Sequence, residues 1–382
     1  IFKDDKRIQM GTMDDSPSFG SVLGDIGGHI LKLSGWDSDM AGKVMALKAH
    51  GRLSKESIEK TKLELKTYEQ CNIDGIRDLW NLPYLERLVY NSISKEGEDL
   101  KIVDHIQFCH EVTEDIFMKY FLENSTKEDV IGYSGGVALN TIINSKLRKA
   151  RNIHIPPHTN DGGLSLGIVE VLREIYNEEP FETDGFPYWQ DDEAPVDRPS
   201  QRTIEETCEL LADGNIVGWY QGHGECGPRA LGNRSILFDP TFEDGKDFVN
   251  RVKRREYFRP FAGTILLEHA HDWFDMKGME QSPHMMYAMD CKEGVAEKIP
   301  SIIHVDGTCR IQTVTQQQNE NYYNLIKEFY DQTGVPIIFN TSFNLGGEPL
   351  VETLDDAVRT LYKSEMEYCF LPEFGKLVVL KN

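Results

Sequence analysis

The sequence predicts an α/β protein with two domains. Two strand–glycine turn–helix units follow one another at 128–149 and 152–176. After residue 202, apolar strands again alternate with helices, which are expected at about 320–333 and 353–363. Between these regions lies an acidic segment with four prolines and no periodicity, which is typical of a linker. We therefore expect an α/β domain over 1–177, a linker over 178–201 and a second α/β domain over 202–382.

The amino-acid composition argues against several classes of protein. The 382 residues include 63 acidic and 41 basic ones, and the resulting net charge of -22 argues against a nucleic-acid polymer as a partner. No run of eighteen apolar residues predicts a membrane span. Seven cysteines without a C-x-x-C pair argue against a disulfide framework and indicate a reducing cytoplasm. The composition leaves the oligomeric state open, and a homodimer is one option.

The first domain is predicted to begin with helices at 52–70 and 97–125. A strand then ends at Tyr133, Gly135 and Gly136 turn the chain, and a helix starts near Val137. Asn160 to Gly163 repeat this design after a second strand. Glycines let a backbone approach a phosphate closely, and helix N-termini attract anions. A single loop of this kind is more often an ordinary turn, so both interpretations stay open.

Arginines beside glycine or proline turns mark the second domain. A guanidinium binds phosphate bidentately and stays charged when partly desolvated, so converging arginines suit a phosphate-bearing substrate. The alternative is a structural salt bridge with one of the many carboxylates. We favour phosphate binding for Arg229, Arg259 and Arg310, and salt bridges for Arg254 and Arg255, which stand next to an acidic residue.

Other polar residues extend this pattern. Arg234 is better explained as a brace of its glycine-rich loop. Asn340 and Ser342 follow the apolar strand "VPIIF", where a ligand crevice forms in an α/β sheet. No G-x-S-x-G motif supports a nucleophile, so Ser342 is expected to donate a hydrogen bond, with helix N-capping as the alternative.

A complete metal site is not predicted. His269 and His271 are two residues apart, and no H-E-x-x-H motif is present. Asp161 is the best single oxygen ligand, because carboxylates at loop ends commonly hold a metal that bridges nucleotide phosphates.

Seven motifs together resemble the O-carbamoyltransferases of antibiotic and nodulation-factor biosynthesis, the NodU/CmcH type. They occur in the family's order and cover nearly the whole chain from about residue 15. They are "AGKVMALKAHG" (41–51), "SGGVALN" (134–140), "NDGGLSLG" (160–167), "GPRALGNRSIL" (227–237), "REYFRPFAG" (255–263), "HVDGTCRIQTV" (304–314) and "NTSFNLGGEP" (340–349).

The resemblance implies a partial actin-like ATPase (Kae1-type) domain followed by a YrdC-like α/β domain. The second would form carbamoyl adenylate from ATP and carbamoyl phosphate. The first would transfer the carbamoyl group to an acceptor hydroxyl of a small molecule, with Fe²⁺ as the metal and Mg²⁺ accompanying ATP.

The resemblance also assigns roles to individual residues. Arg229, Arg259 and Arg310 would hold carbamoyl phosphate and the ATP phosphates, and Asn340 and Ser342 the adenylate phosphate or ribose. The nucleotide loop of the first domain would comprise Gly135, Gly136, Asn140 and Lys43, with Asp161 as a metal ligand.

The chain departs from the family at its start. The family's H-x-x-x-H metal pair and first sheet lie upstream of "AGKVMALKAHG", and residues 1–51 contain no such pair. We therefore expect a fragment that lacks about the first quarter of the family's length. Two alternatives remain, namely a nucleotide-binding module without catalysis and a carbamoyltransferase that acts on a nucleotide or tRNA.

Overall fold

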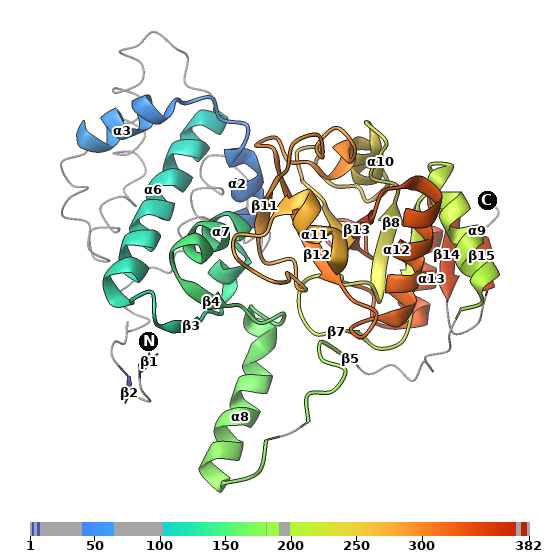
Figure 1. Ribbon diagram of the computed structural model, residues 1–382, viewed down its shortest axis with the longest axis horizontal. Helices are drawn as coiled ribbons and strands as arrows, with labels where there is room; N and C mark the ends of the chain where they lie inside the picture. The colour runs from blue at the N-terminus through green and yellow to red at the C-terminus, as the bar shows by residue number, and fades with distance from the viewer. Residues whose placement is uncertain are drawn as a thin grey trace. The chain divides into compact units, whose positions relative to one another are not determined.

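The structure is a computed structural model. It describes residues 2–3, 6–7, 40–64, 102–180, 182–190, 199–371 and 376–379. The chain divides into two compact units, residues 1–126 and 127–382, which are drawn in Figure 1 and described separately.

Helices make up most of the described part of the first unit. Helix α2 packs against the long helix α6, and their buried contacts include Val44, Leu47 and Phe108. Ser54 begins α3, because its Oγ accepts the backbone N–H of Ser57 at 3.0 Å. The elements of this unit are the hairpin β1 (Phe2–Lys3) and β2 (Lys6–Arg7), and the helices α2 (Met40–Lys48), α3 (Lys55–Glu64) and α6 (Ile102–Asn124).

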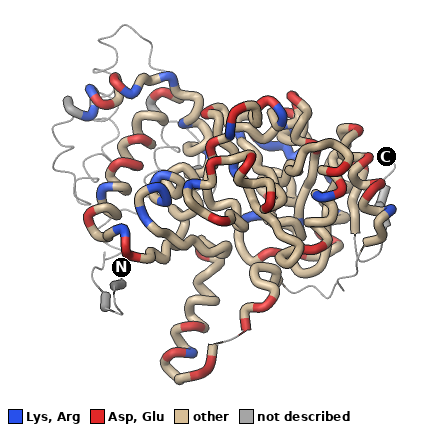
Figure 2. The backbone as a smooth tube through the Cα atoms, viewed as in Figure 1, with Lys and Arg blue, Asp and Glu red and all other residues tan. Residues whose placement is uncertain are grey.

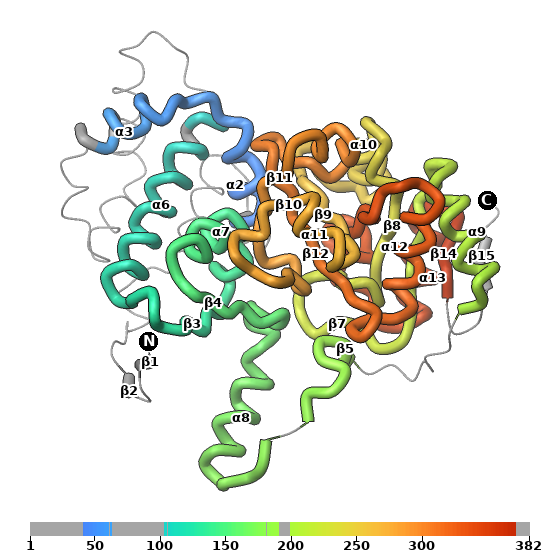
Figure 3. The backbone as a smooth tube through the Cα atoms, viewed as in Figure 1, coloured from blue at the N-terminus to red at the C-terminus, as the bar shows by residue number. Residues whose placement is uncertain are grey.

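The second unit starts with a β–α–β–α segment. Strands β3 (Val130–Gly132) and β4 (Asn152–His154) pair in parallel, and α7 (Thr141–Ala150) connects them. Helix α8 (Leu164–Tyr176) follows β4 and extends away from the rest of this unit, as the tube in Figure 3 shows.

A mixed nine-stranded sheet forms the centre of the second unit. Its strand order is β10-β11-β12-β9-β13-β8-β6-β14-β15. Strands β12 and β9 pair in parallel, whereas β13 runs antiparallel to both of its neighbours. The strands are β6 (Val217–Tyr220), β8 (Arg234–Phe238), β9 (Ala262–Leu266), β10 (Phe274–Asp275), β11 (Ala288–Cys291), β12 (Thr308–Val314), β13 (Ile337–Ser342), β14 (Tyr368–Leu371) and β15 (Lys376–Val379).

Helices pack against this sheet, and α9 and α12 lie side by side. Side chains cap several N-termini; Thr353 and Asp356 form a reciprocal capping box at the start of α13. The helices are α9 (Gln201–Ala212), α10 (Gly245–Val252), α11 (Leu267–Trp273), α12 (Glu320–Thr333) and α13 (Leu354–Lys363).

Aromatic side chains fill the core of the second unit. Trp219 stacks on Phe370 with ring centroids 4.5 Å apart, and Phe339 lies 4.7 Å from Phe261. All four side chains are at most 1% exposed. Burying a side chain of this size stabilises the fold by roughly 1.5–3 kcal/mol, so these contacts hold the central strands in place.

The predicted α/β class is confirmed by this sheet and its helices. Helix α12 begins and ends where the periodicity indicates, and α6 lies within the predicted 97–125. The predicted domain boundary near residue 177 stays a prediction, since the compact units divide at residue 126. Within the predicted linker, β5 (Tyr188–Gln190) pairs with β7 (Gly224–Glu225).

The distribution of charged residues and the hydropathy of the helices agree with what the composition predicts. Figure 2 shows Lys and Arg interspersed with Asp and Glu along the described parts of both units. Among the described helices, none is long and apolar enough to cross a membrane.

Candidate functional site

One face of the central sheet carries polar side chains. Arg310 on β12 pairs with Ala262 on β9, and Ala262 pairs with Asn340 on β13. Directly paired residues point to the same face, so Arg310 and Asn340 flank the small side chain of Ala262. In the next row, Gln312 pairs with Thr264. The sheet thereby brings together two predicted site residues that are 30 positions apart in sequence.

The loop between β6 and β8 makes its contacts over this face. The backbone oxygens of Ala230 and Leu231 accept hydrogen bonds from the amides of Asn340 and Gln312, at 3.2 and 2.8 Å respectively. The same loop contains Arg229, so the sheet residues and the predicted phosphate-binding arginine share one site.

Glu225 organises the loop from within. Its Oε1 accepts the backbone N–H groups of Leu231, Asn233 and Arg234 at 2.7, 2.8 and 3.2 Å. The side chain is fully buried, and burial raises the pKa of this carboxyl. The sequence analysis missed Glu225, because nothing in the sequence shows which backbone groups a lone glutamate will bind.

Two glycines of this loop are required by close contacts. Gly227 has φ 133°, and a Cβ there would lie 2.2 Å from the backbone oxygen of Pro157. Gly232 has φ 108°, and a Cβ would lie 2.2 Å from the ring of Tyr322. Any other residue would be strained at both positions and would clash.

Arg234 braces the loop, as the sequence analysis favoured. Its guanidinium is fully buried and lies 3.7 Å above the ring of Tyr220. It donates hydrogen bonds to the backbone oxygens of Gln221 and Gly222 at 2.6 and 2.8 Å. These contacts hold the start of the loop against the strand that follows it.

Four arginines converge beside the sheet face. Burial, followed by the charges of Arg229, Arg255 and Arg259, holds the pKa of Arg310 well below its usual value. The predicted arginines Arg229, Arg259 and Arg310 therefore lie close enough to interact electrostatically. Arg259 also contacts Glu256, with Nη1 and Oε2 3.6 Å apart, so it forms a salt bridge, and its phosphate-binding role stays a prediction.

Arg255 and Arg254 differ in a way that their sequence neighbours do not indicate. Arg255 contributes to the cluster and lies 5.1 Å from the ring centre of Phe261. Arg254 adopts φ 55° and donates a hydrogen bond to the backbone oxygen of Lys363. The predicted salt bridges of Arg254 and Arg255 stay predictions beside these contacts.

Lys253 is the second residue that the sequence analysis missed. Its Nζ donates to the backbone oxygen of Ser342, and to the backbone oxygen and Oδ1 of Asn344 at 2.8 and 2.9 Å. Burial and the charges of Arg255 and Arg259 hold its pKa well below the ordinary value for lysine. We name Lys253, Arg229, Arg255, Arg259 and Arg310 the cationic cluster. The run of basic residues at 251–255 was the available signal.

Ser342 lies at the end of β13 and not at a helix N-terminus. Its Oγ donates to Asn344 Oδ1 at 2.6 Å. The structure therefore excludes the N-capping alternative and places the hydroxyl beside the Lys253 ammonium, with Oγ 3.4 Å from Nζ.

The first glycine loop lies next to the arginine loop. Gly135 has φ 101°, and Gly136 starts a short 3₁₀ helix that ends at Leu139. Arg229 donates from Nη2 to the Leu139 backbone oxygen at 3.4 Å. Asn140 caps α7 through Oδ1, which accepts the Ile143 N–H at 3.1 Å. Its expected nucleotide role stays a prediction beside this structural one.

Asp161 does not make a metal site with the residues around it. It is exposed at the start of a 3₁₀ turn, and Asn160 Oδ1 accepts the N–H of Gly162 at 2.8 Å. Among the described residues, no three His, Cys, Asp or Glu side chains come together as metal ligands. His269 and His271 lie on helix α11. These residues do not fit the expected iron, and we derive no step through a metal.

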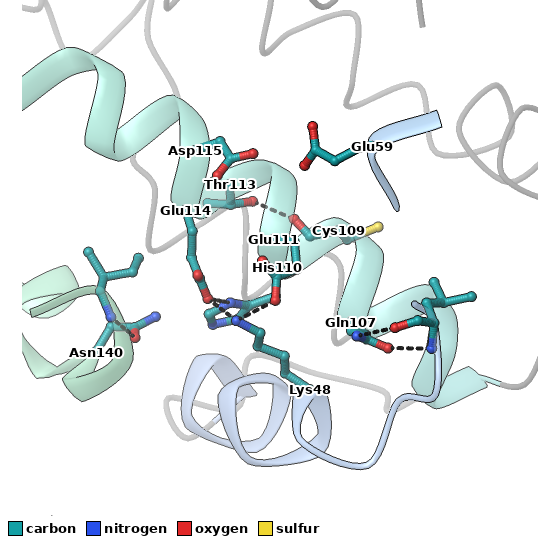
Figure 4. Close-up of polar contacts among 12 residues, drawn as sticks. Lys48, Glu59, Gln107, Cys109, His110, Glu111, Thr113, Glu114, Asp115 and Asn140 are labelled. Atoms are coloured by element: carbon teal, nitrogen blue, oxygen red, sulfur yellow. Dashed lines mark hydrogen bonds and ion pairs between the residues drawn. The ribbon is translucent and has the colours of Figure 1, made fainter. Parts of the chain in front are cut away.

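Lys43 belongs to the first unit, on helix α2. A polar network docks this helix on α6, as Figure 4 shows. Lys48 contacts Glu114 and lies 2.9 Å from Glu111, and Glu114 lies 2.6 Å from Nδ1 of His110. This network fixes the helix that carries Lys43, and the expected nucleotide role of Lys43 remains a prediction.

Comparison with known proteins identifies the family. Residues 208–377 match the family model described as Carbamoyltransferase C-terminus. An uncharacterized protein of Methanocaldococcus jannaschii is 31% identical over 375 residues, which cover 92% of this chain and 71% of that protein. The chain belongs to the carbamoyltransferase family. The resemblance drawn from the seven motifs is thereby confirmed.

Two further relatives have more informative names. The nodulation protein NolNO of Sinorhizobium fredii is 37% identical over 258 residues, covering 62% of this chain and 38% of that protein. A 3'-hydroxymethylcephem-O-carbamoyltransferase of Amycolatopsis lactamdurans is 30% identical over 335 residues, covering 83% of this chain and 61% of that protein. This carbamoyltransferase-family chain thus spans well under half the length of NolNO. The cationic cluster and Asn340 all lie within the segment matched by the family model.

Proposed function

We propose that this chain acts as an ATP-dependent O-carbamoyltransferase that forms carbamoyl adenylate from carbamoyl phosphate and ATP. The cationic cluster carries the proposal. Five buried or half-buried basic side chains in a protein of net charge -22 make a site that an anion would stabilise. A phosphate group is the anion that arginine forks fit bidentately.

The cluster suits the first half of the reaction. Carbamoyl phosphate releases inorganic phosphate on hydrolysis, and a carbamate oxygen then displaces pyrophosphate from the α-phosphorus of ATP. Both steps develop negative charge on phosphate oxygens, which preorganised cations stabilise most strongly in a desolvated site. Lys253 keeps Ser342 and Asn344 in place beside those cations.

The second half would transfer the carbamoyl group to a hydroxyl. An acceptor oxygen attacks the carbonyl carbon of the adenylate, and AMP leaves. A small-molecule acceptor is supported by the relative that is named as a cephem O-carbamoyltransferase. The net charge of -22 disfavours a nucleic-acid polymer as the acceptor.

Pyrophosphate release that requires both ATP and carbamoyl phosphate is the test. Arg310→Ala and Arg229→Ala should each lower the rate about 30- to 1000-fold, since each removes a charged phosphate contact from a desolvated site. Arg202→Ala is the matched control, because Arg202 is an exposed residue of α9 whose Nε bonds Glu206.

Two results would contradict the proposal. Unchanged turnover in both cluster variants would remove the cluster from the reaction. Tight ATP binding without any pyrophosphate from the intact chain would instead favour a nucleotide-binding module without catalysis.

A further inference from the structure

The side-chain amide of Asn340 has a fixed orientation. Its Nδ2 donates to the backbone oxygen of Ala230 at 3.2 Å, and to Thr264 Oγ1 and Gln312 Oε1 at 2.9 and 3.3 Å. A backbone oxygen can only accept, so the nitrogen must face Ala230. The amide of Gln312 is fixed in the same way, because its Nε2 donates to the Leu231 backbone oxygen at 2.8 Å.

This orientation leaves one acceptor without a partner. Asn340 is fully buried, and among the described residues no hydrogen bond reaches its Oδ1. Leaving such a group unpaired destabilises the folded state, so a buried orphan acceptor calls for an explanation. The side-chain donors of Thr264 and Gln312 on this face are already used, by Gln312 Oε1 and the Leu231 backbone oxygen respectively.

Strand β12, which is separated from β13 by β9, presents the complementary orphan. Arg310 lies on the same face, one strand beyond Ala262, and its buried Nε also lacks a hydrogen-bond acceptor among the described residues. The row formed by Arg310, Ala262 and Asn340 thus offers a cation at the Arg310 end and a hydrogen-bond acceptor at the Asn340 end. A fully deprotonated phosphate group has no proton to donate, so it can bind Arg310 but cannot satisfy Asn340 Oδ1.

We propose that Asn340 Oδ1 accepts a hydrogen bond from the amide nitrogen of the carbamoyl group. Carbamoyl phosphate carries an anion at one end and an –NH₂ donor at the other, which matches the row. Asn340 is then a specificity residue that distinguishes carbamoyl phosphate from acyl phosphates without an N–H. This inference rests on the proposed function, because the phosphate end must bind the cationic cluster.

An apolar cover lies over the row in the absence of ligand. Leu231 and Met285 pack against Ala262, and Tyr188 packs against this group. Access to Asn340 would require this cover to shift, and the unbranched side chain of Met285 is suited to changing rotamer. A site closed in this way exposes the orphan acceptor only to a group that fits beneath the cover.

The first experiment uses the unaltered protein. Calorimetry without ATP compares carbamoyl phosphate with acetyl phosphate, in which a methyl group replaces –NH₂, and with inorganic phosphate. We expect carbamoyl phosphate to bind about 10- to 100-fold more tightly than acetyl phosphate, since only acetyl phosphate leaves the buried oxygen unpaired. Equal affinities for the two would overturn the inference while leaving the phosphate site intact.

The second experiment uses Asn340→Leu, which keeps the size of the side chain and removes the acceptor. The preference for carbamoyl phosphate should fall to within about threefold of acetyl phosphate, a difference below 1 kcal/mol. Inorganic phosphate should bind as before, which also shows that the cluster has kept its fold. Asn152→Ser on exposed β4 is the control and should keep the full preference.

The remaining outcomes separate this inference from the proposed function. If Asn340→Leu weakens ATP binding and leaves carbamoyl phosphate unaffected, Oδ1 meets a ribose hydroxyl and the inference is wrong. If none of the three phosphates binds the unaltered protein, the cationic cluster is not a phosphate site, and the proposed function itself fails.

Discussion

Glu225 illustrates how a single buried side chain can determine the shape of a functional loop. Its Oε1 accepts three backbone N–H groups, and its Oε2 has no hydrogen-bond partner among the described residues. Burial raises its pKa, so the ionised form costs folding free energy at neutral pH. The three hydrogen bonds from the loop require the oxygen acceptor of Glu225, and they do not require its negative charge.

Glu225→Gln should therefore change the free energy of unfolding by less than about 1 kcal/mol, because the oxygen that serves the loop remains. Glu225→Ala should lower it by about 2–4 kcal/mol, since three N–H groups lose a buried partner. Urea denaturation of both variants measures the difference. Equal losses would mean that the carboxylate charge, and not the acceptor, holds the loop.

His284 makes stability depend on pH. Burial, followed by the charges of His154 and His158, lowers its pKa to about 4, whereas an unfolded histidine titrates near 6.5. The folded state favours neutral His284, so its contribution is complete above about pH 6.5. It should be lost as the pH falls to about 4, by up to about 3 kcal/mol.

Chemical denaturation between pH 7 and pH 4 tests this expectation. His284→Gln should flatten the dependence of unfolding free energy on pH. His271→Gln, on the exposed side of α11, should leave the dependence as in the unaltered protein. The interpretation fails if the two variants behave alike.

At the scale of elements, α8 differs from every other helix that the structure describes in the second unit. It buries none of its residues, although seven of them are large and apolar: Leu164, Ile168, Val169, Val171, Leu172, Ile175 and Tyr176. Such a face favours self-association in solution.

Replacing Ile168 and Ile175 together with Glu should reduce self-association, measured by light scattering. The free energy of unfolding should change by less than about 0.5 kcal/mol, because exposed side chains contribute little to stability. Ile143→Glu, on the buried face of α7, is the contrasting variant and should unfold the segment. A large loss of stability in the α8 variant would show that its face packs against another part of the protein.

Local pattern predicted the elements well, and it predicted their contacts less well. The periodicity of 320–333 identified α12, and the apolar run before "NTS" identified β13, because side-chain spacing is a local property. The roles of Lys253 and Glu225 depend on partners brought together by folding. The Ser342 oxygens bound by Lys253 are 89 positions away, a distance over which no spacing rule operates.

Arg255 shows that local sequence is equally limited in predicting which partners a charged side chain will have. Its sequence neighbours favoured a salt bridge, whereas in the fold its charge acts on Arg310 together with those of Arg229 and Arg259. The family motifs compensated in part, since they identified Arg229, Arg259 and Arg310 as a group. Motifs report which residues recur together, and the structure adds which atoms they face.

At the scale of the whole molecule, the candidate site is contained in one compact unit. The cationic cluster, the sheet face and the loop that covers it all lie within residues 127–382. Residues 127–382 produced alone should therefore bind carbamoyl phosphate within about threefold of the full chain, measured by calorimetry. Loss of binding by a folded fragment would show that residues 1–126 contribute directly to the site.

The rigidity of the loop at 222–233 has one further consequence for ligand binding. Its amide protons at Leu231, Asn233 and Arg234 point at a carboxylate inside the protein, and its ends continue into β6 and β8 in the interior of the sheet. Hydrogen exchange at these amides should be as slow as in the central strands, unlike exchange in most surface loops. The conformational entropy of the loop is thus lost during folding, and binding a phosphate requires little further ordering of its backbone.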